Sequence, residues 1–326
     1  MRMRNIFMIF LLALMQLIQV CNASAAQKIL IAAYQDNPDY SEVREVFVSG
    51  LTKQADILGL DIEFIYLIDI NNRNEFIEML KQKARNADMI FTAGTPNAMA
   101  IKQAQIKIPV LFSAIADPKK AGLVRFFHDP RSNFTGAYCV VAAHTQLQTL
   151  SRVIPNAKIL GILYNPRDPA PVSQLFSWHK AAAYLPGIKI LDFPIPEGVD
   201  SKAGLAEVTE SMIGIVDVVV TLADAQVSSW GEGMIKTANK YNIPTYVSLS
   251  HLVEKGALVS LGFNFKESVR AINIPQAIKI LQGIPPEAIA VGTYPYYDIS
   301  INLKTAKKIG VTFPSDIINS AANKIE

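Results

Sequence analysis

The sequence is poor in cysteine, has almost no net charge and carries no long apolar run beyond its amino terminus. Two cysteines in 326 residues exclude a fold held together by disulfides. The net charge of +3 comes from 31 basic and 28 acidic residues spread along the chain, so nothing indicates a nucleic acid partner. Half of the residues are hydrophobic and 18% are charged, which excludes a disordered chain and fits a globular protein of about two domains.

Catalytic and metal-binding motifs are also missing from the sequence. The four histidines, His128, His144, His179 and His251, stand apart from one another without the H-E-x-x-H spacing of a metal site. There is no G-x-S-x-G nucleophile motif, no P-loop lysine motif and no G-x-G-x-x-G after the first apolar run. We therefore expect no catalytic residue, no metal and no cofactor, and a binding protein rather than an enzyme.

The amino terminus has the layout of a secretory signal peptide. Two arginines precede an apolar run over residues 6–20, and the small residues ASA follow at 23–25. The run is shorter than the roughly 20 residues that span a bilayer, and a lipoprotein site at Cys21 lacks the small residues expected before it. We predict cleavage of residues 1–25 and a periplasmic or other extracytoplasmic location. Cleavage leaves Cys139 alone, and its apolar, strand-like surroundings favour buried packing over a reactive thiol.

Short apolar runs rich in β-branched residues alternate with amphipathic stretches of helical length along the rest of the chain. The predicted strands are 28–33, 61–67, 89–93, 110–114, 158–164, 188–193, 216–222, 245–247 and 257–265. The predicted helices are 40–58, 73–85, 96–105, 172–185, 202–213, 226–241 and 267–281. This alternation predicts an α/β fold in which helices cover both faces of parallel sheets.

The alternation runs through the chain twice, which indicates two lobes. We predict a first lobe from residues 26–138 and about 265–295, and a second from about 139–264 and about 296–326. Each lobe is expected to be a doubly wound parallel sheet, and several connecting strands form the hinge between them. Such a hinge allows the lobes to close on a ligand.

Ligands of open parallel sheets bind at the carboxyl ends of the strands, where loops and helix amino termini meet. After the third predicted strand, Gly94 and Thr95 open a helix with Pro96 in its first turn. The free N–H groups there can bind an anion such as a carboxylate, or Thr95 can simply cap its own helix. Asp224, after a buried strand of the second lobe, can bind a ligand amine or cap the next helix. The sequence leaves both choices open.

Further polar residues follow other predicted strands. Tyr164 and Asn165 end a strand before a proline-rich loop, where asparagine is also a common turn former. Tyr34 follows the first strand, Asp117 the fourth, and Ser250 a strand of the second lobe. These five residues complete the candidate ligand site because they share this placement.

Ordered segments of the chain carry a family resemblance. They include FTAGTPNAMA, IPVLFSAIADPKKAGLV, NFTGAY, ILGILYNP, VDVVVTLADAQV and IPTYVSLSHLVEKGALVSLGFNF. In this order they resemble the substrate-binding proteins of ABC importers. The group in question has the type I periplasmic binding protein fold and includes binders of tryptophan, tyrosine and phenylalanine.

The resemblance implies a two-lobed clamp that closes on a small ligand and delivers it to a membrane permease. The family's glycine-threonine falls on Gly94 and Thr95, its tyrosine-asparagine on Tyr164 and Asn165, and its cleft aspartate on Asp224. We expect a monomer that binds an amino acid, aromatic or branched, or a related small metabolite. The alternative is a sensing module that closes on its ligand and docks on a membrane receptor kinase or cyclase.

The chain departs from the family pattern at several positions. Ala225 stands where an asparagine often follows the cleft aspartate, and Ala170 and Pro171 replace an asparagine-serine pair. Phe265 stands in place of a tyrosine, and Val269 in place of a glycine. Each lost polar group removes a hydrogen bond that a buried ligand would otherwise accept or donate.

Overall fold

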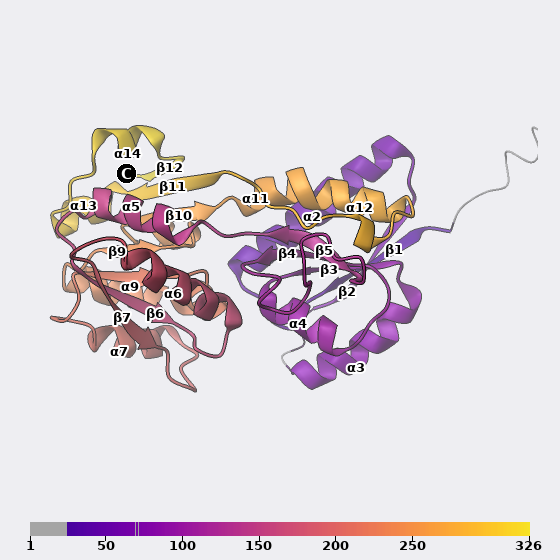
Figure 1. The fold of residues 1–326 in the computed structure, drawn as a ribbon, viewed down its shortest axis with the longest axis horizontal. Helices are drawn as coiled ribbons and strands as arrows, with labels where there is room; N and C mark the ends of the chain where they lie inside the picture. Colours follow the sequence, from indigo (N-terminus) through magenta and orange to yellow (C-terminus); the bar gives the residue numbers. More distant parts are fainter. Residues whose placement is uncertain (1–24, 69, 71) are drawn as a thin grey trace, which may run out of the picture.

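Two α/β lobes lie next to each other along the long axis of the molecule (Figure 1). The computed structural model describes residues 25–68, 70 and 72–326, so the predicted signal peptide lies outside this part except for its last residue. None of the helices described there is both long and apolar enough to cross a membrane.

The first lobe is a five-stranded, entirely parallel sheet covered by helices on both faces. Its strands are β1 (Gln27–Ala32), β2 (Ile62–Leu67), β3 (Met89–Ala93), β4 (Val110–Ile115) and β5 (Phe134–Tyr138), in the order β2-β1-β3-β4-β5. Its helical elements are α2 (Pro38–Leu58), α3 (Arg73–Lys83), η1 (Ala84–Asn86), α4 (Thr95–Gln103), α11 (Phe265–Ser268), η2 (Val269–Asn273), α12 (Ile274–Leu281) and η3 (Pro286–Ala288). Helices α2 and α12 pack on one face, and α3 and α4 pack on the other.

The second lobe is a seven-stranded sheet, again between two helical layers. Its strands are β6 (Ile159–Tyr164), β7 (Lys189–Pro194), β8 (Val218–Thr221), β9 (Thr245–Val247), β10 (Val259–Phe263), β11 (Tyr297–Asn302) and β12 (Asn323–Ile325), in the order β12-β11-β10-β9-β8-β6-β7. Its helices are α5 (Ala143–Val153), α6 (Pro169–Ala182), α7 (Lys202–Glu210), α8 (Ala225–Trp230), α9 (Glu232–Lys240), α10 (His251–Glu254), α13 (Leu303–Ile309) and α14 (Ser315–Ser320).

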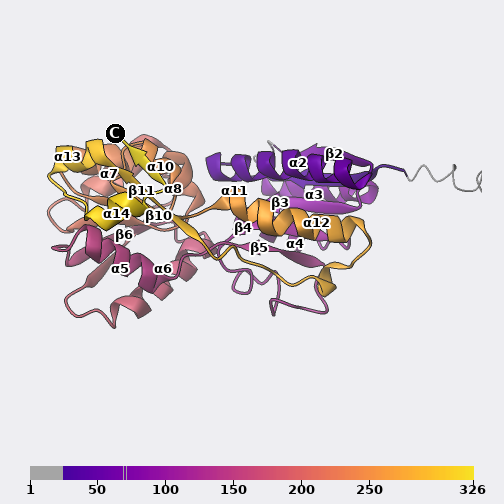
Figure 2. The same ribbon diagram turned by 90° about the horizontal axis from the view of Figure 1, so that it is seen from above.

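The chain crosses between the lobes three times: after β5, after β10 and before β11 (Figure 2). Two of these crossings are tied together, because Tyr138 N–H donates to the Gly292 carbonyl at 3.0 Å. The predicted fold class, two doubly wound lobes joined by a multi-strand hinge, is therefore confirmed.

Each sheet has its own hydrophobic core. The central strands are buried on both faces, which explains why their sequences are continuous apolar runs. Strand β3 is buried along its whole length, as expected of a central parallel strand with helices on both faces. On one of these faces, Phe91 of β3 stacks on Phe47 of α2 with ring centroids 3.6 Å apart. The largest fully buried side chain, Trp178 of α6, meets Tyr246 of β9 in the second lobe.

Helices α5, α13 and α14 and strands β5, β11 and β12 lie outside the predicted ranges, and two further details differ from the sequence-based expectations. Strand β11 runs antiparallel to β10, because the chain enters the second lobe from the hinge for the second time at that point. The helix predicted over 226–241 is two helices, which meet at Gly231. A Cβ atom at Gly231 would lie 2.5 Å from the Val227 carbonyl oxygen, so the tight junction between α8 and α9 requires glycine.

The substitution Gly233→Ala tests how closely α9 packs on α7. Alanine in a helix usually adds about 1 kcal/mol of stability relative to glycine. Here the added Cβ would lie 1.8 Å from the Lys202 carbonyl oxygen, so we expect Gly233→Ala to lower the free energy of unfolding by about 1–3 kcal/mol. Urea denaturation measures this change. Lys236→Ala on the exposed side of α9 is the control, and a Gly233→Ala variant as stable as that control would contradict the prediction.

Candidate functional site

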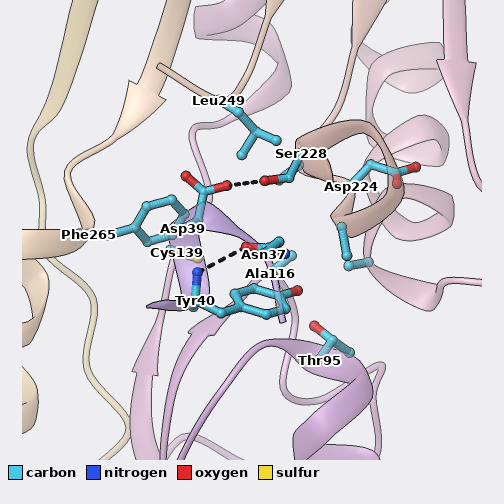
Figure 3. Close-up of a pocket in the computed structure, with 14 residues that line it drawn as sticks. Asn37, Asp39, Tyr40, Thr95, Ala116, Cys139, Asp224, Ser228, Leu249 and Phe265 are labelled. Atoms are coloured by element: carbon cyan, nitrogen blue, oxygen red, sulfur yellow. Dashed lines mark hydrogen bonds between the residues drawn. The ribbon is translucent and has the colours of Figure 1, made fainter. Parts of the chain in front are cut away.

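A cavity lies between the two lobes, at the carboxyl ends of strands from both sheets (Figure 3). Its lining residues come from the end of β4 and from the loops and helix starts that follow β1, β3, β4, β5, β6, β8, β9 and β10. They are Asn37, Asp39, Tyr40, Thr95, Ala114, Ala116, Cys139, Ala170, Ala223, Asp224, Ala225, Ser228, Leu249 and Phe265. The space of about 30 Å³ holds about one water molecule.

A wider groove of about 720 Å³ adjoins this cavity and also joins the two lobes. We call it the outer groove. From the first lobe it is lined by Tyr34, Gln35, Asp36, Arg73, Pro96 and Met99, and from the second by Asn165, Arg167, Asp168, Pro169, Gly198, Val199, Asp200, Ala225, Gln226, Ser229 and Trp230. Its volume is in the range of small-molecule sites.

Helix α4 points an uncapped amino terminus at the cavity. Gly94 precedes it with φ +92°, and a Cβ there would lie 2.2 Å from Cζ of Tyr40, so the position requires glycine. No side chain caps this helix. The side chain of Thr95 is 3% exposed, and within the described part of the chain its hydroxyl has no hydrogen-bond partner. The structure thus disfavours the self-capping role of Thr95 and leaves its hydroxyl available to a ligand.

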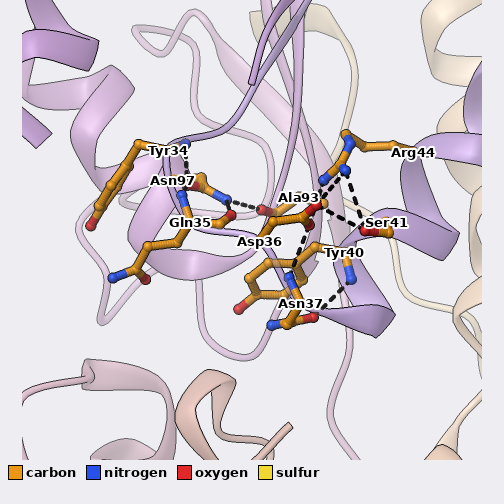
Figure 4. Close-up of polar contacts among 9 residues, drawn as sticks. All are labelled: Tyr34, Gln35, Asp36, Asn37, Tyr40, Ser41, Arg44, Ala93 and Asn97. Carbon is orange, nitrogen blue, oxygen red and sulfur yellow. Dashed lines mark hydrogen bonds and ion pairs between the residues drawn. The ribbon is translucent and has the colours of Figure 1, made fainter. Parts of the chain in front are cut away.

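Asn97 on α4 fixes the first loop of the site (Figure 4). Its Oδ1 accepts hydrogen bonds from the backbone N–H groups of Tyr34 and Gln35 at 3.0 and 2.9 Å. Its Nδ2 donates to the carbonyls of Gln35 and Ala93, both at 2.8 Å. This buried side chain, which the sequence analysis missed, therefore joins the ends of β1 and β3 and positions Tyr34 at the outer groove.

Asp224 caps helix α8, which is one of the two roles that the sequence left open. Its carboxylate accepts hydrogen bonds from the backbone N–H groups of Asn165, Gln226 and Val227 at 2.6, 2.8 and 3.1 Å. Burial raises the pKa of Asp224, and these three hydrogen bonds oppose that rise. Asp224 lines the cavity and also holds the loop after β6 against α8.

Asp168 is a second buried carboxylate at the site, and sequence analysis did not single it out. It caps α6, where Oδ1 accepts the Ala170 N–H at 2.8 Å, and the residue is only 6% exposed. In the described structure its Oδ2 has no hydrogen-bond partner. Burial raises the pKa of Asp168 to about 7, and the nearby charge of Asp224 adds to the rise. The sequence signal was an aspartate directly before proline at a helix start.

A third carboxylate joins the lobes directly. Asp39, in the first turn of α2, accepts a hydrogen bond from Ser228 Oγ of α8 at 2.7 Å (Figure 3). Its Oδ1 also lies 3.0 Å from His251 Nδ1 of α10. Burial lowers the pKa of His251, but the hydrogen bond and charge of Asp39 outweigh it and the pKa is raised overall. In the sequence His251 stands alone, and its partner Asp39 lies 212 residues away.

The other predicted site residues lie apart from the cavity. Tyr34 and Asn165 line the outer groove. Asp117 accepts the N–H groups of Lys119 and Lys120 and faces a separate groove, while Ser250 lies in a third groove beside the hinge. Tyr164 packs against the core of the second lobe. The structure therefore brings Thr95 and Asp224 together at the cavity, with Gly94 directly before Thr95, and disperses the rest.

Cys139 lies in a buried environment, as its apolar surroundings in the sequence predict. Cys139 is buried beside the hinge, and burial raises the pKa of its thiol. Its environment agrees with the predicted packing role. Within the described ranges, no three histidine, cysteine, aspartate or glutamate side chains gather in a way that could hold a metal ion.

The molecule has two α/β lobes, a hinge between them and a groove between the lobes that is large enough for a small molecule. These features define a two-lobed solute-binding protein. The comparison with protein families agrees: the model of the ABC transporter substrate binding protein family matches residues 28–325. The chain belongs to this family and is an ABC transporter substrate-binding protein. Proteins of this family act outside the cytoplasm.

Individual relatives were found both by sequence and by structure. A tyrosine-binding protein of Clostridioides difficile (strain R20291) is 26% identical over 286 residues, which cover 86% of this chain and 79% of the relative. A conserved domain protein from Vibrio cholerae superposes with a TM-score of 0.83 at 27% identity, covering 92% of this chain and 99% of that one. An ABC domain in complex with L-Trp from Streptococcus pneumoniae also gives a TM-score of 0.83, at 23% identity, covering 92% and 100%.

Ser228→Ala tests the contact between the lobes. The change removes a hydrogen bond to a buried carboxylate, so we expect the closed arrangement to lose about 1.5 kcal/mol and the affinity for a ligand that bridges the lobes to fall about tenfold. Because the pKa of His251 is raised in this contact, the contact should weaken as pH rises through that pKa. Calorimetric titration measures both effects. Ser177→Ala on exposed α6 is the control, and equal affinities would refute the prediction.

Asp168→Asn tests the cost of the buried carboxylate. The folded-state pKa of about 7 lies above the unfolded value near 4, so ionisation of Asp168 removes stability as pH rises between these values. Asparagine caps a helix equally well. We expect the ligand-free variant to be more stable than wild type at pH 8, by an amount on the order of 2–4 kcal/mol, and equally stable at pH 4. Urea denaturation at the two pH values decides, and a gain that is the same at both would contradict the prediction.

Proposed function

We propose that the protein is the exported solute-binding component of an ABC importer and that it closes its lobes on an amino acid, which it delivers to a membrane permease. Family membership supports the role in transport. Two relatives support the ligand class: one is named a tyrosine-binding protein, and another was solved in complex with L-Trp. The predicted signal peptide supports export, and we expect the mature chain to act as a monomer.

The observation that carries this proposal is the uncapped start of α4 with the free hydroxyl of Thr95. Backbone N–H groups at a helix amino terminus favour an anion, and an α-carboxylate fits such a place. The neighbouring Pro96 lines the outer groove, so a ligand held at Thr95 extends into that groove. The cavity of about 30 Å³ is too small for a whole amino acid, whereas the outer groove of about 720 Å³ has ample room.

Aromatic side chains near Thr95 support an aromatic or branched ligand. The ring of Tyr40 packs against Gly94 at the floor of the cavity, and Tyr34 lines the outer groove beside Pro96. We propose Tyr34, Gly94 and Thr95 as the ligand contacts of the first lobe, and Asn165 and Asp224 as part of the facing wall of the second lobe.

Closure follows from contacts to both lobes. A ligand that touches α4 in the first lobe and the loops of the second binds the closed arrangement more tightly than the open one and shifts the equilibrium toward it. The contact of Asp39 with Ser228 and His251 adds to the closed arrangement without touching the ligand. Binding and closure are therefore coupled, which suits a protein that presents a loaded form to a permease.

A thermal-shift screen of residues 26–326 against amino acids, small carboxylates, nucleosides and polyamines tests the proposal. A ligand at 100 times its dissociation constant stabilises the fold by about 2.7 kcal/mol, which raises Tm by several degrees. We expect tryptophan, tyrosine or a branched amino acid to do so. For the amino acid with the largest shift, Thr95→Val should reduce the affinity about tenfold and leave Tm unchanged without ligand, because the hydroxyl has no hydrogen-bond partner among the described residues.

Thr92→Val is the matched control for this change. Thr92 lies on β3 close to Thr95, and its hydroxyl donates to the Ala32 carbonyl at 2.8 Å within the core. This variant should lower Tm and leave the affinity unchanged. If no amino acid raises Tm while another class of compound does, the proposed ligand class is wrong.

A further inference from the structure

A buried carboxylate without a counterion faces the outer groove. Only 6% of the surface of Asp168 is exposed to solvent. One of its oxygens accepts the Ala170 N–H at 2.8 Å, and the other has no partner among the described residues. A buried carboxylate normally has an ion pair or several hydrogen bonds, because leaving it unpaired costs free energy. The unpaired oxygen is therefore a place for a cationic ligand group.

The cations of the chain near Asp168 do not supply its counterion. Arg167 donates to the carbonyls of Ile195 and Pro196 at 3.4 and 3.3 Å. Arg73 lines the same groove from the other lobe, but no ion pair joins it to Asp168 within the described residues. The raised pKa of Asp168, to about 7, agrees with the lack of a nearby positive charge.

Two tyrosines of the first lobe lie across from Asp168. The pKa of Tyr34 and that of Tyr40 are raised, first by burial and then in part by the negative charge of Asp168. Tyr34 lines the same groove as Asp168, so a cation held by Asp168 would share this groove with an aromatic ring, and such rings attract positive charge. Asp168 belongs to the second lobe and the tyrosines to the first, so such a cation would contact both lobes.

Resting on the proposed function, we infer that Asp168 binds the α-ammonium group of the amino acid ligand, with Tyr34 and Tyr40 beside it. The carboxylate end of the same ligand lies at Thr95, whose neighbour Pro96 lines the outer groove together with Asp168. Asp224, the family's cleft aspartate, already accepts three backbone N–H groups and serves as a helix cap. Asp168 is therefore the carboxylate that selects amino acids over analogues that lack the amine.

Other ionisable groups surround Asp168 and enter any pH experiment. They are Tyr34, Asp36, Tyr40 and Arg73 from the first lobe, and Arg167, Asp200 and Asp224 from the second. Asp36 is paired with Arg44, with contacts of 2.7 and 2.6 Å, and does not compete for the ligand.

The test compares ligands with and without the amine. Calorimetry measures the binding of L-tyrosine and of its desamino analogue 3-(4-hydroxyphenyl)propionate to wild type, Asp168→Asn and Asp200→Asn. If tryptophan binds better than tyrosine, L-tryptophan and indole-3-propionate are the ligand pair. Asp200 lines the same groove but is exposed, so its variant is the matched control. We expect Asp168→Asn to weaken amino acid binding at least tenfold and to leave the desamino analogue within twofold of wild type.

The pH dependence gives an independent readout. Wild-type affinity for the amino acid should fall as pH drops through the pKa of Asp168, approaching tenfold per pH unit below it, because the protonated carboxyl cannot pair with an ammonium group. Asp168→Asn should show no such fall. The contact of His251 with Asp39 changes affinity in the opposite direction with pH and is present in both proteins.

Each other outcome has a defined meaning. If Asp168→Asn binds the amino acid as tightly as wild type, or loses both ligands equally, the inference is wrong and the proposed function stands. If wild type binds no amino acid, the proposed function is wrong, and tyramine and putrescine then decide about Asp168. Binding of either amine by wild type and its loss in Asp168→Asn would support recognition of a cation by Asp168, and no binding of amines by wild type would overturn that too.

Discussion

The site depends on one constraint of parallel sheets, which is that all strands of a sheet end on the same edge. In both lobes this edge faces the other lobe, so residues distant in sequence line a single cavity. Thr95 follows β3, Cys139 follows β5, Asp224 follows β8 and Leu249 follows β9. Because the edge also holds helix starts, the same loops supply both the caps of helices and the groups that can hold a ligand.

Three buried carboxylates at this edge are stabilised in three ways. Asp224 is satisfied by backbone N–H groups of its own lobe, and Asp39 by side chains of the opposite lobe. Asp168 has one backbone partner and a pKa raised to about 7. A group held at a cost in stability is typical of binding sites, where the ligand supplies the missing partner. The differences in partners thus divide the three residues into a cap, a contact between lobes and a candidate ligand contact.

Much of the fold could be predicted from the alternation of apolar runs and amphipathic stretches. Strands β3 and β9 begin and end where the sequence places them. The direction of β11 could not be predicted, because it depends on the path of the chain through the hinge. The break at Gly231 is accompanied by a close approach of the Val227 carbonyl oxygen one turn away. A single glycine in a helical pattern does not predict such a contact.

The sequence by itself determined the two α/β lobes, the family and the strand ends at which a ligand site could form, because these follow from local periodicity and short motifs. Only the tertiary structure decided which polar residues at those ends remain free. Among the described residues, Thr95 and Asp168 keep an oxygen without a hydrogen-bond partner. Asp117 is held by N–H groups of its own loop, and Asp224 by N–H groups of α8 and of the loop after β6. The pairing of Asp39 with a histidine 212 residues away likewise exists only once the lobes meet, since hydrogen bonds depend on distance in space and not along the chain.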